Sequence, residues 1–362
     1  MQIRKLKMIN FRNYSNTSIE FSDHYNLIYG KNGMGKTNLI EAIYVLALTK
    51  SFRGTVDKVV VMDNAVSAKI EGKVNATISS TYQIIISNDG KKVKIDSNNI
   101  PKLSDYISKI SVILFNPDDL RIIKDTPSIR RKNLNVDISQ LNNVYLKLLN
   151  TYNKYLKQRN LYLKSMNINA NTDTDYLDVL TEKIIDIGLK IYNYRQEFIE
   201  KLNTKLGAIY LQITGEKGVS IKYVSDYVGL DKKDILSLYK KNLQRDIILG
   251  KTNLGIHHDD ILFLKGEKNM KDYGSEGQQK NCIISYKLAE IEIFKEKKED
   301  YPILILDDLF SELDNEKINN ILSLLDKQVQ TFITTTDISQ VDKAILDNSK
   351  IIKVDKGFLR EE

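Results

Sequence analysis

The chain has 362 residues, of which 42% are hydrophobic and 28% charged, a composition typical of a folded globular protein and not of a disordered one. It contains no run of about 18 apolar residues and no signal-like apolar stretch near residue 1, so we expect a cytoplasmic protein without a membrane partner. The net charge of +7 and the pI near 9.0 favour an anionic partner, with nucleic acid first. A single cysteine, Cys282, excludes an internal disulfide.

The first predicted elements surround a phosphate-binding loop. Short strands are expected over residues 5–11, 19–21 and 26–29, followed by Gly30-Lys31-Asn32-Gly33-Met34-Gly35-Lys36-Thr37 and a helix over 38–48. In such a loop the backbone N–H groups surround phosphates, Lys36 reaches their oxygens, and the Thr37 hydroxyl binds Mg²⁺. An accidental glycine turn is the alternative, but it does not explain the strand and helix on either side.

The next segments predict a mixed sheet and then a helical lobe. Strands are expected over 59–62, 66–71, 77–87, 93–96 and 111–115, with a hairpin turn at Asn88-Asp89-Gly90. Apolar stripes over 141–166 and 177–202 predict two antiparallel helices joined by the polar loop 167–173. These helices are too short for an extended coiled-coil arm. A strand over 219–224 and a helix over 232–249 follow.

Lysine and arginine gather at several places along the chain, at residues 130–132, 154–159, 232–233, 240–241 and 295–298. Each cluster alone is more typical of a solvated helix face than of a phosphate contact. Only their sum favours nucleic-acid binding.

The last third of the chain carries a second set of polar motifs. Ser275-Glu276-Gly277-Gln278 precedes a helix through residues 284–293, where it is either an anion site or an ordinary helix cap. The apolar strand 303–306 ends in Asp307 and Asp308. We expect Asp307 to hold Mg²⁺ through water and Asp308 to polarise the attacking water. Residues 311–314 follow, and then the strand 331–333, which ends in three threonines.

These motifs, in this order, resemble the ATP-binding-cassette ATPases, with a signature motif at Ser275, a D-loop at 311–314 and a switch residue at Thr335 or Thr336. The resemblance implies an ATP-dependent homodimer in which Ser275 and Gly277 act on the nucleotide of the other copy. Lys36 and Asp308 are then the catalytic residues, and Thr37 and Asp307 the Mg²⁺ ligands. The residues implied to bind ATP are Gly30, Lys31, Asn32, Gly33, Met34, Gly35, Lys36, Thr37, Asn38, Ser275, Gly277 and Gln278.

Finer motifs resemble the RecF family, the recombination mediators of the SMC/Rad50-like branch. They lie at residues 10–14, 50–53, 115–120, 128–132 and 307–314. The expected fold is α/β: an ABC-type P-loop ATPase head with a mixed sheet plus a short helical lobe. We expect ATPase parts at 1–127 and 251–362 and the lobe at 128–250. The pair Asp307-Asp308 replaces the Asp-Glu of transporters and suggests slow hydrolysis.

The resemblance implies an ATP-dependent DNA-binding protein with weak, DNA-stimulated ATPase activity. It would dimerise on double-stranded DNA and at single-strand/double-strand junctions, and with RecR and RecO help load RecA at gaps during repair, replication restart and the SOS response. Arg12 and Arg53 are candidate phosphate or DNA contacts, with structural salt bridges as the alternative. Arg130 and Arg131 are DNA candidates that could equally face an acidic neighbour.

One segment departs from the pattern of the RecF family. Gly255-Ile256-His257-His258-Asp259-Asp260 stands where the family has Gly-Pro-His-Arg-Asp-Asp. A metal site there is disfavoured, because neighbours on a strand point to opposite faces. Three alternatives to a RecF-like mediator stay open. They are a transporter ATPase, an SMC-like or DNA-end-processing ATPase with a long coiled coil, and a nucleotide-binding DNA scaffold with little turnover.

Overall fold

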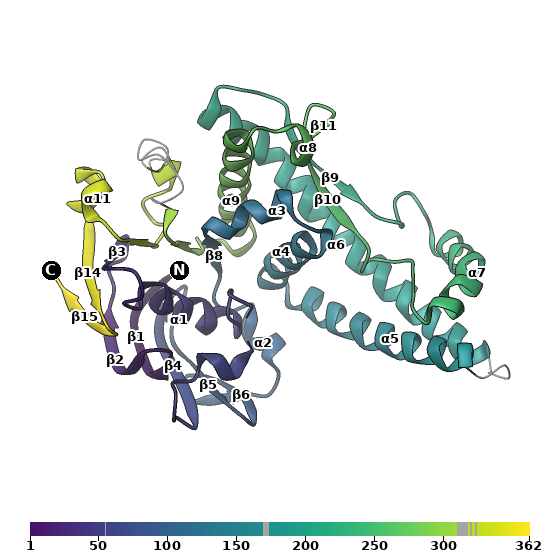
Figure 1. Ribbon diagram of the computed structural model, residues 1–362, viewed down its shortest axis with the longest axis horizontal. Helices are drawn as coiled ribbons and strands as arrows, with labels where there is room; N and C mark the ends of the chain where they lie inside the picture. Colours follow the sequence, from purple (N-terminus) through teal and green to yellow (C-terminus); the bar gives the residue numbers. More distant parts are fainter. Residues whose placement is uncertain (55, 169–173, 310–317, 319–320, 323) are drawn as a thin grey trace. The chain divides into compact units, whose positions relative to one another are not determined.

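The computed structural model describes the whole chain except residues 55, 169–173, 310–317, 319–320 and 323 (Figure 1). It divides into two compact units, residues 1–119 with 284–362 and residues 120–283. The second unit contains the whole predicted lobe 128–250 and extends beyond it at both ends. Ser275 therefore belongs to the second unit, although the predicted bounds assigned it to the ATPase part.

The first unit contains an antiparallel sheet of order β2-β1-β4-β5-β6-β7. Its strands are β1 (Gln2–Phe11), β2 (Tyr14–Glu20), β4 (Ser67–Asn75), β5 (Ser79–Ser87), β6 (Gly90–Ile95) and β7 (Asn98–Ile100). Alternating apolar residues bury one face, and helix α1 (Lys36–Leu48) contacts β1, β4 and β5. A Cβ at Gly72 would lie 2.3 Å from Leu46, so glycine permits this close approach.

The second sheet of this unit has the order β15-β14-β3-β13-β12-β8. It contains β3 (Tyr25–Tyr29), β8 (Val112–Phe115), β12 (Ile303–Leu306), β13 (Thr331–Thr335), β14 (Ser349–Asp355) and β15 (Phe358–Glu361). All neighbours are parallel except β14 and β15. Parallel pairing brings the carboxyl ends of β3, β13 and β12 to one edge, where α/β sheets bind ligands.

The predicted strand at 59–62 is wrong. Residues Asp57–Val60 form the 3₁₀ helix η1, and Val61 makes only an isolated bridge to Phe11. The run of valines favours a strand locally, but tertiary contacts prevail. The carbonyl oxygens of Val59 and Val60 accept hydrogen bonds from the Arg12 side chain and the Arg12 backbone, respectively.

The described residues of the first unit also form the short helices α2 (Leu103–Ile107), η4 (Ile338–Gln340) and α11 (Lys343–Leu346). The short helix η2 (Pro117–Leu120) and the longer α9 (Glu276–Lys298) contain residues of both units. Among the helices of the described residues, none combines the length and the apolar content needed to cross a bilayer.

The second unit is built on two long helices, α5 (Asn143–Ile168) and α6 (Thr174–Thr214), which pack together as the stripes predict. Around them lie α3 (Arg121–Lys124), α4 (Pro127–Leu141), α7 (Lys232–Leu249) and α8 (Met270–Tyr273). Strands β9 (Val219–Val224), β10 (Asp260–Lys265) and β11 (Lys268–Asn269) form a small antiparallel sheet. The predicted strand 219–224 and helix 232–249 are confirmed.

The core of the second unit is unusually polar. Arg159 pairs with Asp246 at 2.8 Å and Arg195 with Asp259 at 2.6 Å, and all four side chains are at most 1% exposed. Buried charges persist in proteins only when they are paired and hydrogen-bonded. Arg159, which belongs to one of the basic clusters in the sequence, is therefore a core residue.

His257 and His258 lie in a turn before β10, so the premise that they are neighbours on a strand is wrong. Both rings contact the Thr252 carbonyl, at 3.1 and 3.3 Å, and Tyr152 contacts the other ring nitrogen of His257. Burial lowers the pKa of His257 to about 4, so its ring is neutral at pH 7. The described residues contain no group of three or more histidine, cysteine or acidic side chains placed to hold a metal ion.

Candidate nucleotide site

The phosphate-binding loop has backbone geometry that only glycine adopts easily. Gly30, Gly33 and Gly35 have φ values of 154°, 79° and 117°. A Cβ on Gly30 would lie 2.3 Å from the Val354 carbonyl oxygen. Helix α1 then begins without a side-chain cap and without an acidic residue in its first turn. Its N-terminus is therefore suited to an anion such as a phosphate.

Lys36 is held inside the curve of this loop. Its ammonium group donates to the carbonyl oxygens of Gly30 at 2.6 Å and Lys31 at 3.2 Å. Burial lowers the pKa of Lys36, and the negative charges of Asp308 and Asp307 oppose that shift. The lysine and the two carboxylates are thus close enough to interact electrostatically.

Asp307 and Thr37 offer a pair of oxygen ligands. The Thr37 hydroxyl donates to Asp307 Oδ1 at 3.4 Å, and the Thr334 hydroxyl donates to the same oxygen at 2.7 Å. Burial raises the pKa of Asp307, while the bond from Thr334 and the Arg53 charge act in the opposite direction. Hydroxyl and carboxylate oxygens are the ligands that Mg²⁺ prefers, so this pair fits the ion.

Thr334 is a site residue that the sequence analysis missed. It binds Asp307 through its hydroxyl and also accepts the Asp308 backbone N–H at 2.9 Å. Asp308 has a φ of 51°, in the left-handed region. The Thr335 hydroxyl instead bonds to the backbone of Asp337, and Thr336 is exposed. The three consecutive threonines gave no signal to separate the first from the other two.

Glu41 is a second residue that sequence reasoning missed. It is fully buried and accepts two bonds from the Arg12 guanidinium, at 2.9 and 2.7 Å, and one from the Ser51 hydroxyl at 2.5 Å. Arg53 lies 3.5 Å from the same carboxylate and donates to Asn38 Oδ1 at 3.0 Å. Arg12 and Arg53 thus share one carboxylate beside the loop, and Asn38 joins the network.

Residues outside the phosphate-binding loop also hold its backbone in place through hydrogen bonds. Asn13 donates to the Met34 carbonyl at 3.1 Å and accepts from the Asn38 amide at 2.8 Å. The Tyr14 hydroxyl donates to the Gly35 carbonyl at 2.9 Å, and the Gly357 N–H donates to the Met34 carbonyl at 3.1 Å. The motif at 10–14 therefore supports the phosphate loop directly.

Arg130 and Arg131 face acidic neighbours within the second unit. Arg130 is 5% exposed and makes two bonds to the Asp260 carboxylate, at 2.6 and 2.9 Å. Arg131 donates to the Asp259 backbone carbonyl at 2.8 Å. The Arg130 guanidinium is therefore satisfied by the protein itself, which favours the acidic-neighbour alternative over a DNA contact.

The predicted signature motif lies at the start of α9. The Ser275 hydroxyl accepts the Gln278 N–H at 3.3 Å, and the Gln278 side chain accepts the Ser275 N–H at 3.1 Å. This reciprocal pair is a helix cap. Ser275 and Gly277 are both exposed, and a Cβ on Gly277 would meet no neighbouring atom. The predicted D-loop, 311–314, lies outside the described residues.

Comparisons with known proteins agree over the full chain. The model of the RecF/RecN/SMC N-terminal domain matches residues 2–359. The DNA replication and repair protein RecF of Ligilactobacillus salivarius is 38% identical over 100% of this chain and 98% of that protein. RecF of Halalkalibacterium halodurans is 39% identical over 100% of both.

Solved structures give the same result. A structure of the recombination mediator RecF with ATP, in the RecFOR pathway, has a TM-score of 0.92 and 30% identity over 99% of this chain and 97% of that one. An Smc head domain from Pyrococcus furiosus, with a TM-score of 0.54 and 16% identity, shares the fold alone. The predicted α/β ATPase-head fold is confirmed, and the chain belongs to the RecF family.

Proposed function

We propose that this protein is an ATP-dependent DNA-binding recombination mediator with slow ATPase activity. The observation that carries the proposal is the convergence of Lys36, Thr37 and Asp307 beside the uncapped start of α1. Relatives named as DNA replication and repair proteins, and a RecF structure with ATP, support the same reading.

In this proposal each side chain has a separate task. Lys36 and the loop N–H groups bind the phosphates, and Thr37 and Asp307 hold Mg²⁺. When bound, Mg²⁺ offsets the charge of the β- and γ-phosphates. Asp308 accepts a proton from the attacking water. Its side chain is one methylene shorter than the glutamate of transporters, which is consistent with slow turnover.

ATP would join two copies of the chain. Ser275 and Gly277 are exposed at the start of a 23-residue helix, as residues that bind a partner's γ-phosphate must be. The dimer would form on double-stranded DNA and at single-strand/double-strand junctions, and DNA would stimulate its weak ATPase activity. There it would act with RecR and RecO to help load RecA.

The test is the molar mass by light scattering with and without Mg-ATP. We expect the wild type to dimerise with ATP, and Ser275→Arg and Lys36→Ala to remain monomeric. Ser237→Arg adds the same bulk and charge at an exposed position of α7 and should dimerise normally.

A wild type that stays monomeric with ATP would contradict dimerisation by nucleotide alone, and duplex DNA would then be added as a second ligand. A monomer under that condition as well would overturn the dimer model and favour the scaffold. Dimerisation of Ser275→Arg would exclude the predicted contact with the partner's nucleotide.

A further inference from the structure

One face of the antiparallel sheet in the first unit carries lysines on three strands. Residues paired across neighbouring strands lie on the same face, and the register pairs Lys5 with Lys73 and Ile9 with Lys69. The same register continues through β5 to β6, pairing Gln83 with Lys94. The residues of this outer lysine face are Lys5 and Lys7 on β1, Lys69 and Lys73 on β4, and Lys92 and Lys94 on β6.

Three carboxylates lie on the same face, and they neutralise only part of its charge. Lys5 pairs with Glu20 at 3.1 Å and Lys69 with Glu71 at 2.9 Å. Asp96 accepts the Thr81 backbone N–H at 2.7 Å. Within the part of the chain that the structure describes, the side-chain ammonium groups of Lys73, Lys92 and Lys94 make no ion pair or hydrogen bond. The face therefore keeps a net positive charge.

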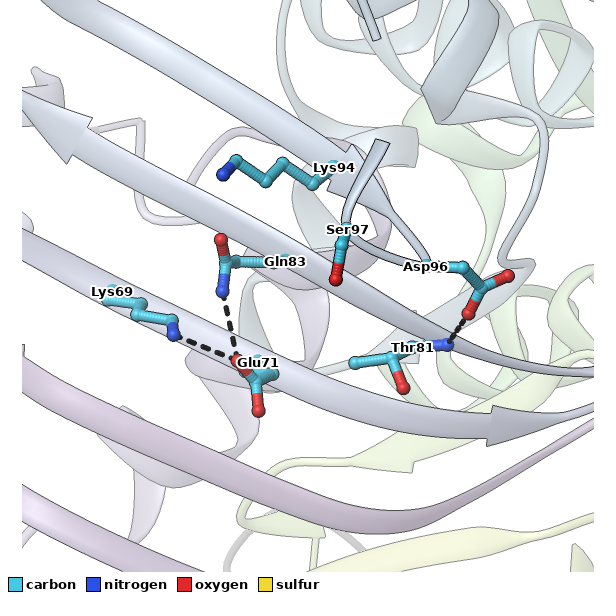
Figure 2. A pocket seen from close by; sticks show the side chains of 7 residues that line it. All are labelled: Lys69, Glu71, Thr81, Gln83, Lys94, Asp96 and Ser97. Carbon is cyan, nitrogen blue, oxygen red and sulfur yellow. Dashed lines mark hydrogen bonds and ion pairs between the residues drawn. The ribbon is translucent and has the colours of Figure 1, made fainter. Parts of the chain in front are cut away.

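A hollow of about 660 Å³ lies on this face. Figure 2 shows the Lys69 ammonium and the Gln83 amide directed at the Glu71 carboxylate, with Lys94 extending beside them. The bond from Lys69 holds the pKa of Glu71 below its ordinary value, so the carboxylate stays ionised and paired. The hollow is lined by Lys69, Glu71, Thr81, Gln83, Lys94, Asp96 and Ser97.

We infer that the outer lysine face binds the sugar-phosphate backbone of duplex DNA. Alternate residues of a strand lie about 7 Å apart and neighbouring strands about 4.8 Å apart, so the lysines of β1 and β6 are separated by about 14 Å. B-form DNA carries one negative charge per about 1.7 Å of its axis. Several phosphates can therefore meet this face together.

The composition of the face favours a duplex over a single strand. Proteins that bind single strands without sequence preference stack the bases on aromatic side chains. In the described residues the outer face offers Ile9 and Ile85 as its apolar side chains and no aromatic ring. Phosphate contacts made by lysine position a duplex without reading its sequence. An acidic protein segment is the competing partner, and the experiment separates the two.

This inference rests on the proposed DNA-binding function and names the surface that performs it. The test is the salt dependence of binding to a fluorescent duplex of about 30 base pairs, between about 50 and 200 mM salt. Replacing Lys73, Lys92 and Lys94 by glutamine should make the negative slope of log K against log salt shallower by about 2.7, because each phosphate contact contributes about −0.9.

The control replaces Lys102, Lys327 and Lys343 by glutamine. These lysines are exposed in the same unit but lie off the sheet, so the net charge changes equally while the slope should stay unchanged. Replacing Lys73, Lys92 and Lys94 by arginine should keep the wild-type slope. The double variant Lys92→Gln/Lys94→Gln, confined to β6, should make the slope shallower by about 1.8 and serves if the triple variant fails to fold.

The possible outcomes separate failure of this inference from failure of the proposed DNA-binding function. A wild type that does not bind duplex DNA overturns both. A wild type that binds, with the same slope in the glutamine variants, overturns the outer lysine face alone. Glutamine variants that keep duplex binding but lose binding to poly-L-glutamate would assign the face to an acidic protein and overturn the inference.

Discussion

Two arginines of the first unit and two of the second form ion pairs with buried carboxylates, but in different ways. In the second unit Arg159 and Arg195 each have a buried acid, and both members of each pair are at most 1% exposed. In the first unit Arg12 and Arg53 share the single carboxylate of Glu41, and the Arg53 side chain is 37% exposed. The former pairs are closed to ligands, whereas the latter leave positive charge beside the phosphate loop.

We therefore expect the closed pairs of the second unit to contribute mainly to stability, and the arginines that share Glu41 to contribute mainly to function. Removing one member of a closed pair leaves a buried charge without compensation, which destabilises the fold. Removing a member of the shared set changes the charge near the phosphate loop. The following predictions test that separation, beginning with the largest expected effect.

Asp246→Ala should destabilise the second unit by about 3–5 kcal/mol, because the Arg159 guanidinium would remain buried without its acid. Chemical denaturation followed by circular dichroism measures this loss. Asp186→Ala removes an acid from the exposed Lys232–Asp186 pair and should leave the denaturation midpoint unchanged. Equal effects of the two substitutions would contradict a stabilising role for the buried pair.

Asp308→Asn should reduce ATP turnover by about 100-fold or more, because an amide cannot accept the proton of the attacking water. Phosphate release measures turnover, and light scattering with Mg-ATP should still show the dimer. A variant with normal turnover would remove Asp308 from the chemistry. A wild type with no turnover, and DNA binding equal to that of the variant, would favour the scaffold.

Glu41→Gln should weaken ATP binding by about 10-fold, the equivalent of one charge-assisted hydrogen bond of about 1.4 kcal/mol. The amide keeps the shape of the side chain but no longer fixes two guanidinium groups. Binding of a fluorescent ATP analogue provides the measurement, with Glu20→Gln on β2 as the exposed control. If thermal stability falls and nucleotide affinity does not, Glu41 belongs with the closed pairs.

Acidification should destabilise the second unit through His257. Its pKa is about 4 in the folded state and about 6.5 when unfolded, so the unfolded chain binds the proton first. The stability contributed by the neutral ring is complete above pH 6.5 and is lost as the pH falls towards 4. Because the ring is partly exposed, we expect the free energy of unfolding to fall by about 1 to 2 kcal/mol over this range. Denaturation of the wild type and of His257→Asn across this range tests it; identical pH profiles would contradict it.

The sequence predicted the features whose signals are local. The helix Lys232–Leu249 is bounded by the Asp231–Asp234 capping box and by Gly250, which has a φ of 60°, and each of these signals lies at the helix end that it marks. The phosphate loop is similar, because glycine spacing, the strand before it and the helix after it occur within one short segment.

What the sequence did not predict depends on partners far apart in the chain. Glu41 occupies a helix position that could as well be exposed, and only the arrival of Arg12 from the β1–β2 turn shows why it is buried. Arg130 similarly reads as part of a basic cluster until Asp260, on β10, is found beside it. Pairing between distant segments leaves no periodic signal.

The contacts that support the phosphate loop also affect the order of folding during synthesis. The loop at residues 30–37 packs against Val354 and receives a hydrogen bond from Gly357, in the β14–β15 hairpin. A ribosome makes residues 30–37 before it makes residues 354–357. The loop of a nascent chain therefore gains these two contacts only after the β14–β15 hairpin has emerged from the ribosome.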